Sequence, residues 1–355
     1  MTTEWQMGFF DRDERLAKLD KLGYILVDLK RIVDFEIFRP LLAGALEKKQ
    51  NSTNGGRPAL DPIFMFKILI LQRLYNLSDE RVEFQINDRL TFQRVLGLDI
   101  NSPVPDYTSV WLFREKLTAS GVIKQLFDLF TEKLSERGLI QKGGTIVDAT
   151  FVEVPKQRNT REENEMIKEG KTPSEWEKKP QKLSHKDVDA RWAKKNKATY
   201  YGYINHLLGD APSKFMRDYI VTNASVHDSQ CGSQLIGEKN EGENGFGDSA
   251  YKSAEMDAHL VSCKVNNFIH EKVRRGHPLS EKSKETNRKK SGVRCLVEHI
   301  FGCRENSMGG IFLKTIGIER ARTGIGLMNL AYNMLRLVQL RRLGRAPNWP
   351  CPASA

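Results

Sequence analysis

The 355-residue sequence lacks any long apolar run. Its longest apolar stretch, residues 63–71, is interrupted by Lys67 and is much shorter than the ~18 residues that a membrane-spanning helix needs. The first residues include Asp11 and Asp13 and contain no apolar segment of the kind found in secretory signals. We therefore expect a cytoplasmic protein that makes no contact with a membrane.

Cysteine is also scarce. The five cysteines are odd in number and form no CxxC pair, which argues against a disulfide framework and against a zinc ribbon. Cys295, His299 and Cys303 have helical spacing. Three ligands on one straight helix rarely converge on a tetrahedral ion, so we do not expect zinc there.

Basic residues outnumber acidic ones, 56 to 45, and the excess is confined to one part of the chain. Residues 1–137 carry 20 of each sign, so the net charge of +11 belongs entirely to residues 138–355. Within that part, an acidic centre at residues 198–271 lies between basic segments at 156–197 and 272–311. This order predicts a cation site beside a nucleic-acid backbone, although charge runs more often mean only a solvated surface.

Residues 1–137 are predicted to form a helical domain. Asp61 followed by Pro62 indicates a helix start, Ser78 is expected to cap a second helix and Thr108 a third. The helices expected here cover residues 39–49, 61–74, a segment after 78, 110–117 and 122–137. The region near 78–117 fits either a helix-turn-helix or a plain bundle, so the domain is expected to bind DNA ends or to dimerise.

Residues 138–343 are predicted to form an α/β domain with a mixed sheet flanked by helices, followed by a tail at 344–355. The polar segment 156–197 is interpreted as a basic insertion of loops with little core, and 272–288 as a basic loop. Strands are expected at 145–154, 200–208, 215–223, 244–248 and 267–270, and helices at 228–237, 253–262, 289–303 and 323–343.

Three carboxylates stand out because each interrupts an apolar element. Asp148 lies within a strand-like run, Asp248 ends another, and Glu298 interrupts an apolar helix face. A buried carboxylate is expensive unless it is paired or binds a cation. Three of them converging would suit a two-metal phosphoryl-transfer site with Mg²⁺. The non-catalytic alternative is that Glu298 pairs with Arg294 one turn earlier and that Asp148 only caps a strand. The nearest rival for the second acid is Asp228, which resembles a helix N-cap.

Several sequence segments resemble the DDE transposases of bacterial insertion sequences, and family five of insertion sequences in particular. The resemblance covers about residues 38–343 and rests on segments that occur in the same order. They are GRPALDP at 56–62, TIVDAT at 145–150, YGYINH at 201–206, VHDS at 226–229, GDSAY at 247–251, RCLVEHIFG at 294–302, SMGG at 307–310 and TIGIERAR at 315–322.

The resemblance implies an RNase H-like catalytic domain preceded by a helical amino-terminal domain. It also implies a catalytic and metal-binding triad of Asp148, Asp248 and Glu298 with two Mg²⁺ ions, for which Mn²⁺ is a substitute. Arg294 matches a family signature. The tyrosine and lysine of that signature are replaced by Ser291 and Glu305, and a further lysine between the tyrosine and asparagine of the YGYINH segment is replaced by Ile204.

The expected function is therefore cleavage of DNA at element ends and strand transfer into target DNA. The alternatives are a catalytically inactive transposase-derived DNA-binding protein and a structure-specific nuclease. The expected partners are terminal-repeat and target DNA and, because two ends must meet, a second or further copy of the chain. The basic residues expected to contact DNA are Arg274, Arg275, Arg288, Lys289, Lys290 and Arg294.

Overall fold

The computed structural model describes residues 10–47, 60–99, 101–195, 197–273 and 279–350. The chain divides into two compact units. The first comprises residues 1–72, 77–114 and 334–355, and the second comprises residues 73–76 and 115–333. None of the described helices is long and apolar enough to cross a membrane.

The first unit is helical throughout its described part. Its core contains Phe35, Phe38 and Phe66, whose rings lie 5.1 to 6.4 Å apart. The Arg114 guanidinium is buried and donates a 2.8 Å hydrogen bond to the Asp79 carboxylate. The helices that lie wholly or partly in this unit are α1 (Asp11–Lys21), α2 (Ile25–Ile32), α3 (Arg39–Leu46), α4 (Pro62–Leu74), α5 (Asp79–Asp88), α6 (Leu90–Leu96), α7 (Tyr107–Ser120) and the end of α16 (Ile318–Arg342).

The helix starts predicted from capping residues are confirmed at two of three positions. Asp61 accepts a hydrogen bond from the Phe64 amide at 2.9 Å, and Ser78 caps α5. The cap predicted at Thr108 is wrong. Asp106 accepts from the Ser109 amide at 2.6 Å instead, and α7 begins at Tyr107. The sequence reading also missed α1 and α2.

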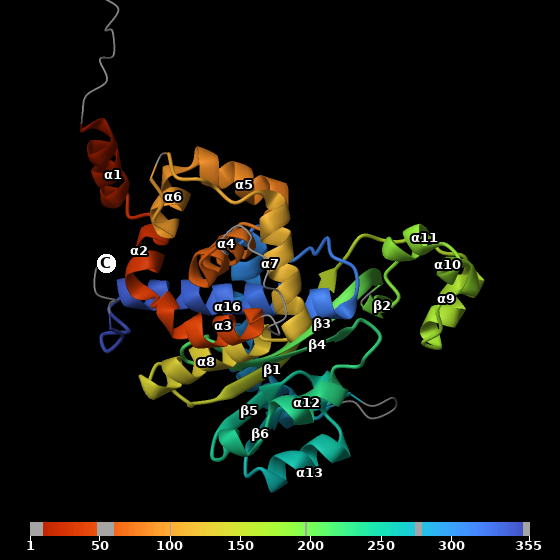
Figure 1. Ribbon diagram of the computed structural model, residues 1–355. Coiled ribbons are helices and arrows are strands. Elements are labelled where there is room, and N and C mark those ends of the chain that lie inside the picture. The colour runs from red at the N-terminus through yellow and green to blue at the C-terminus, as the bar shows by residue number, and fades with distance from the viewer. Residues whose placement is uncertain (1–9, 48–59, 100, 196, 274–278, 351–355) are drawn as a thin grey trace, which may run out of the picture. The chain divides into compact units, whose positions relative to one another are not determined.

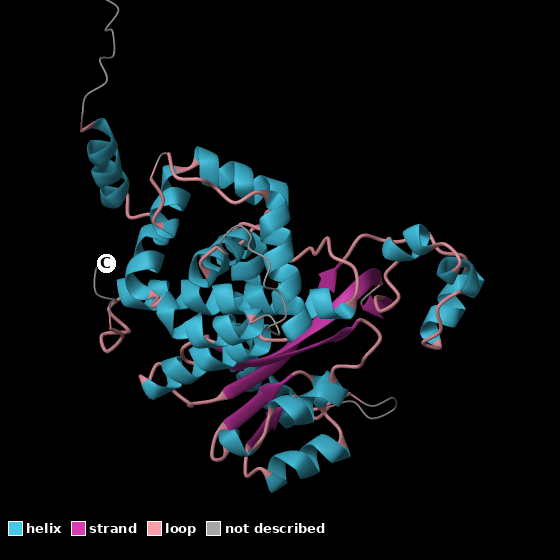
Figure 2. Cartoon of the chain, viewed as in Figure 1, coloured by secondary structure: helices cyan, strands magenta, loops and turns pink. Residues whose placement is uncertain are grey.

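The second unit is built on a twisted mixed sheet (Figures 1 and 2). The central strand β1 pairs antiparallel with β3 on one side and parallel with β5 on the other, and β5 pairs parallel with β6. Both β2 and β4 pair antiparallel with β3. The strands are β1 (Thr145–Glu153), β2 (Arg191–Lys195), β3 (Ala198–Asp210), β4 (Met216–Asn223), β5 (Asn244–Gly247) and β6 (Asn266–Ile269). The predicted fold class, an RNase H-like domain after a helical region, is confirmed.

Helices cover both faces of this sheet because its strands present apolar side chains on each. On one face, Val147 and Leu208 pack with residues of α12 (Ser229–Leu235) and α13 (Ala254–Ser262), which lie together in Figure 1. On the other face, Phe127 of α8 (Ile123–Glu136) packs its ring edge-on against Tyr219 of β4, and Asn329 of α16 bonds to Asn205 of β3. The catalytic carboxylates predicted on β1 and after β5 thus lie on a sheet held from both sides.

The insertion at 156–197 is more ordered than predicted. It contains α9 (Arg161–Lys168), α10 (Ser174–Glu177), α11 (Pro180–Ser184) and β2, and Figure 1 shows the three helices grouped beyond the end of β2. Thr160 and Glu163 form a complete capping box at the start of α9. Trp176 is fully buried, so the segment has a small core of its own rather than loops alone.

The predicted basic loop at 272–288 is also wrong over its second half. Ser280 accepts a hydrogen bond from the Ser283 amide and starts α14 (Glu281–Arg294), so the charged run is helical. The helix predicted at 289–303 is not continuous. It is broken by a 3₁₀ turn (Cys295–Val297) before α15 (Glu298–Gly302), which runs into a π-helical turn (Cys303–Ser307).

Substitution of Gly202 tests the packing between β1 and β3. Its φ is +146°, and an added Cβ would lie 2.3 Å from the Val152 carbonyl oxygen. We expect Gly202→Ala to lower the free energy of unfolding by ~2–4 kcal/mol, from backbone strain and overpacking together. Gly292, inside α14, has nothing within 4 Å of its ideal Cβ. Gly292→Ala should instead raise stability by ~0.5–1 kcal/mol. Urea unfolding measures the free energy of unfolding of both variants. Equal changes in the two would show that the conformation and close packing of Gly202 are not the cause of its effect.

Candidate active site

Asp148 lies in the middle of β1 and is 8% exposed. One carboxylate oxygen accepts a 2.8 Å hydrogen bond from the Ala149 amide, and the other accepts one of 2.8 Å from Arg294 Nη1. Burial nevertheless dominates, because it disfavours the charged form more than these donors favour it. The pKa of Asp148 is raised to about 6.

Asp248 is placed beside Asp148 by the parallel pairing of β1 and β5. Ile146 is opposite Phe246 in this register, and the two aspartates each follow two residues later. Neighbouring strands lie ~4.8 Å apart, so the two side chains emerge at the same end of the pair. Asp248 also accepts a 2.8 Å hydrogen bond from the Ala250 amide. The negative charge of Asp248 contributes to the raised pKa of Asp148.

Glu298 is the first residue of α15 and is exposed. Arg294, four residues earlier, forms its ion pair with Asp148 and not with Glu298. Among the described residues, no group of three His, Cys, Asp or Glu side chains has the geometry of a metal site. The structure therefore links Asp148 with Asp248 and Arg294, while the position of Glu298 in the triad stays a prediction.

Asp228 is more closely connected to this pair than its sequence context indicated. It occupies the N-cap position of α12, but its side chain makes no capping hydrogen bond. Its Oδ1 lies 3.7 Å from Nδ1 of His206, a fully buried ring. Burial, and then the charge of Asp248, raise the pKa of Asp228, while burial lowers that of His206 to about 4. His206 is therefore neutral at pH 7.

Lys195 is a functional candidate that the sequence reading missed. Its positive charge lowers the pKa of both Asp148 and Asp228, which places the ammonium near the two carboxylates. It lies at the end of β2, inside the segment interpreted as an insertion. Only the pairing of β2 with β3 brings it to the site, and sequence alone offered no signal for that pairing.

The residues predicted to contact DNA differ in their surroundings. Arg288 and Lys289 are exposed on α14, where Lys289 forms a 2.9 Å ion pair with Glu285. Lys290 is half-buried and donates a 2.8 Å hydrogen bond to the Ile269 carbonyl. Arg294 is committed to Asp148. Arg274 and Arg275 lie outside the described residues.

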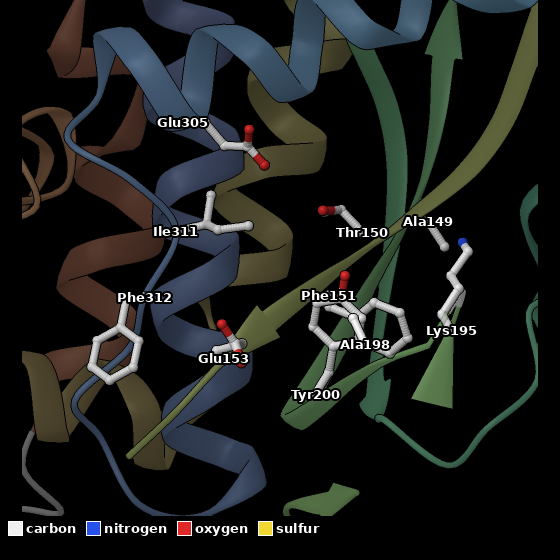
Figure 3. A pocket seen from close by; sticks show the side chains of 10 residues that line it. All are labelled: Ala149, Thr150, Phe151, Glu153, Lys195, Ala198, Tyr200, Glu305, Ile311 and Phe312. Atoms are coloured by element: carbon white, nitrogen blue, oxygen red, sulfur yellow. The ribbon is translucent and has the colours of Figure 1, made fainter. Parts of the chain in front are cut away.

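The three positions that depart from the family signatures are also placed. Ile204 is 4% exposed within β3. The Ser291 hydroxyl lies 3.4 Å from Nε2 of His270. Glu305 is exposed on the π-helical turn and lines a pocket of about 560 Å³ that begins at Ala149, next to Asp148 (Figure 3).

Two family models match the chain. Residues 140–334 match the model of the Transposase DDE domain, and residues 13–116 match that of a Transposase domain (DUF772). The chain belongs to the DDE transposases. A cryo-EM structure of the piggyBac transposase synaptic complex with hairpin DNA is also similar to it, with a TM-score of 0.45 and 12% identity. That match covers 92% of this chain and 78% of the other.

DDE transposases generally use divalent metal ions, and the two aspartates of this transposase have suitable chemistry. Carboxylate oxygens are the ligands that Mg²⁺ prefers. Asp148 is buried, its pKa is raised, and Asp248 adds a second negative charge beside it. A divalent cation would relieve both the desolvation and the repulsion, so the donor set of this pair fits the metal.

Replacing Asp148 tests how much its buried charge lowers the free energy of unfolding of the transposase when no metal ion is bound. Because its pKa is about 6 when folded and 3.8 ordinarily, the folded state holds this proton more tightly. Stability from this group is thus present below about pH 4 and is lost as the pH rises through 6. In EDTA at pH 7.5, Asp148→Asn should raise the free energy of unfolding by ~1–3 kcal/mol, and by less at pH 5.

Urea unfolding at the two pH values measures this difference. Asp88→Asn, at an exposed residue of α5, is the matched control and should change stability by no more than ~0.5 kcal/mol. A gain from Asp148→Asn that is the same at pH 5 and pH 7.5 would show that ionisation of this carboxyl is not its cause.

Proposed function

We propose that this transposase cleaves DNA at the ends of an insertion sequence of family five and joins the 3′-hydroxyls to target DNA. The observation that carries the proposal is the position of Asp148 and Asp248, each two residues beyond the last paired residues of β1 and β5, within a chain of the DDE family. The buried, partly neutralised carboxylate of Asp148 is a poor structural residue and a good cation ligand.

In this proposal Asp148, Asp248 and Glu298 hold two Mg²⁺ ions, with Mn²⁺ as a substitute. Such ions stabilise the attacking and leaving oxygens of an in-line displacement at phosphorus. Arg294 orients the Asp148 carboxylate through its 2.8 Å hydrogen bond. The exposed Arg288 and Lys289 of α14 neutralise phosphates of the bound duplex, and Arg274 and Arg275 are assigned the same role from sequence alone.

The proposal extends to organisation and partners. Residues 1–137 would form the domain that binds element ends or dimerises, and residues 138–343 the catalytic domain. Because two ends must be held together, the active form is at least a dimer. The substrate is bacterial DNA, so the expected place of action is the cytoplasm.

Asp148→Asn should abolish excision while DNA binding is retained or strengthened. The amide lacks the negative charge that holds Mg²⁺, and its neutrality also removes a charge that repels phosphate. The assay is incubation with a plasmid that carries candidate terminal repeats, in Mg²⁺ or in EDTA, with excised and joined products resolved on a gel. Asp88→Asn should excise normally. Wild-type binding without excision would favour an inactive DNA-binding protein, and cleavage without joining would favour a nuclease.

The same assay separates Glu298 from Asp228 as the third acid. Glu298→Gln should reduce excision to the level of Asp148→Asn, because the proposed second ion loses a ligand. Asp228→Asn should keep most of the activity, since its carboxylate faces the buried His206. Loss of excision with Asp228→Asn and retention with Glu298→Gln would transfer the third position to Asp228.

A further inference from the structure

Two pockets follow one another along β1, starting beside Asp148. The first has a volume of about 560 Å³ and is lined by residues of β1 from Ala149 to Glu153 other than Val152, by Lys195 of β2 and Tyr200 of β3, and by Glu305, Ile311 and Phe312. The second, of about 350 Å³, is lined by residues 154–158 and by Lys314, Thr315 and Ile316. The same two stretches of chain thus line both pockets in the same order.

The first pocket is aromatic. The rings of Phe151 and Tyr200 are stacked 4.3 Å apart with an interplanar angle of 2°, and Lys195 Nζ lies 5.9 Å from the Phe151 ring. The carboxylates of Glu153 and Glu305 also line it (Figure 3). The two negative carboxylates would repel a phosphate group inside this pocket. They accept hydrogen bonds from N–H groups, which nucleobases carry, and the rings offer a surface for stacking.

The first pocket includes the part of β1 that β5 leaves unpaired. In the described sheet, β5 pairs with β1 only at Thr145 and Ile146. At the far end, the Leu313 amide donates a 3.0 Å hydrogen bond to the Glu153 carbonyl. The β1 residues of the pocket lie between these two attachments and follow Asp148 in the chain, while Lys195 and Tyr200 extend the lining over β2 and β3. A group bound there would be adjacent to the proposed site of cleavage.

The second pocket is basic. Lys156, Arg158, Lys186 and Lys314 line it together with a single acid, Asp187. Asp187 is 2% exposed and accepts hydrogen bonds from the Tyr203 hydroxyl and from the amides of Asp189, Ala190 and Gly317. The hydrogen-bond acceptors of this carboxylate are therefore already occupied. The four basic side chains outnumber it, so the net charge at the pocket is positive.

Two polar atoms at the second pocket have no hydrogen-bond partner among the described residues. They are the buried Thr315 Oγ1 and Gln157 Oε1. A buried hydroxyl without an acceptor is unfavourable, and a phosphate oxygen that reached Thr315 would provide one, whereas Gln157 Oε1 is itself an acceptor and could not bond to a phosphate oxygen. Beside the pocket, Lys156 Nζ lies 6.0 Å from the ring of Trp192, which is 42% exposed. Cations and an exposed ring occur together here as well.

We propose that the two pockets form one track for an unpaired strand of DNA, with a base stacked at Phe151 and Tyr200 and the backbone phosphates at Arg158 and Lys314. A positive groove combined with aromatic platforms is the general means of holding single strands. If fully extended, the seven residue steps from Phe151 to Arg158 would reach at most ~23 Å, the length of a few nucleotides. The track rests on the proposed function, since it assigns the DNA strand that reaches Asp148.

The test measures binding apart from cleavage. Fluorescence anisotropy in EDTA compares a labelled 12-nucleotide single strand with the 12-base-pair duplex of the same sequence. Phe151→Leu with Tyr200→Leu keeps an apolar side chain at each position and removes both aromatic faces. It should weaken single-strand binding about tenfold, which is ~1.4 kcal/mol, and change duplex binding less than about twofold.

The control for the aromatic variant is Phe268→Leu, a half-buried ring that packs 5.2 Å from Phe246 elsewhere in the same sheet. It should leave the affinities for both DNAs unchanged, and circular dichroism melting checks that each variant is folded. Equal weakening towards single strand and duplex, or none towards either, would overturn the track.

A second arm uses charge and does not touch the sheet. Arg158→Gln with Lys314→Gln should flatten the dependence of log K on log salt for the single strand by ~1.4, at ~0.7 for each phosphate. Lys168→Gln with Lys179→Gln, two exposed cations of the same insertion, should leave the slope unchanged. An unaltered slope for Arg158 and Lys314 excludes them as phosphate contacts. Failure of wild-type excision would sink the proposed function without affecting either binding arm.

Discussion

The buried carboxylate of Asp148 is the constraint on which the rest of the second unit depends. A charged group in the middle of a central strand must be compensated, and the Arg294 guanidinium and the Ala149 amide do so only in part, since its pKa remains near 6. A branched apolar residue would pack better there. Helices packed on both faces hold β1 in place. Their packing offsets the free-energy cost of burying this carboxylate, which stays in a position where we propose that it binds a cation.

Much of this arrangement could be predicted from sequence because its signals are local. Asp148 and Asp248 each interrupt or end an apolar strand, and parallel pairing of two such strands brings their equivalent ends together. The partner of Arg294 could not be predicted in the same way. Helical spacing favours Glu298, four residues away, whereas the fold supplies Asp148, 146 residues away. The 3₁₀ turn at residues 295–297 interrupts the helix between Arg294 and Glu298, and no local sequence pattern predicts this interruption.

The two segments mispredicted as loops, 156–197 and 272–288, share one cause, which is the interpretation of high charge as a sign of loop structure. In α9 and α14 the deciding signals are the caps at Thr160 and Ser280, which override composition. The insertion then needs very little apolar surface. Trp176 is fully buried, its indole N–H donates to Glu163 at 2.7 Å, and the Lys186 ammonium lies 4.8 Å from its ring. Counting apolar residues underestimates a core made of one large ring and its polar partners.

A buried polar layer fixes the register on which the candidate active site depends. The side-chain amides of Asn205 on β3 and Asn329 on α16 exchange hydrogen bonds of 3.0 and 3.2 Å, and Arg304 Nη1 lies 3.4 Å from the Asn329 oxygen. Arg304 is fully buried and burial lowers its pKa to about 10, so the layer is costly. A slip of β3 by one residue would turn Asn205 to the other face of the sheet. Asn329 and Arg304 would then be buried without this hydrogen-bond partner. Since β3 also pairs with Asp148 through Leu207, the interaction that forbids the slip also holds Asp148 in position.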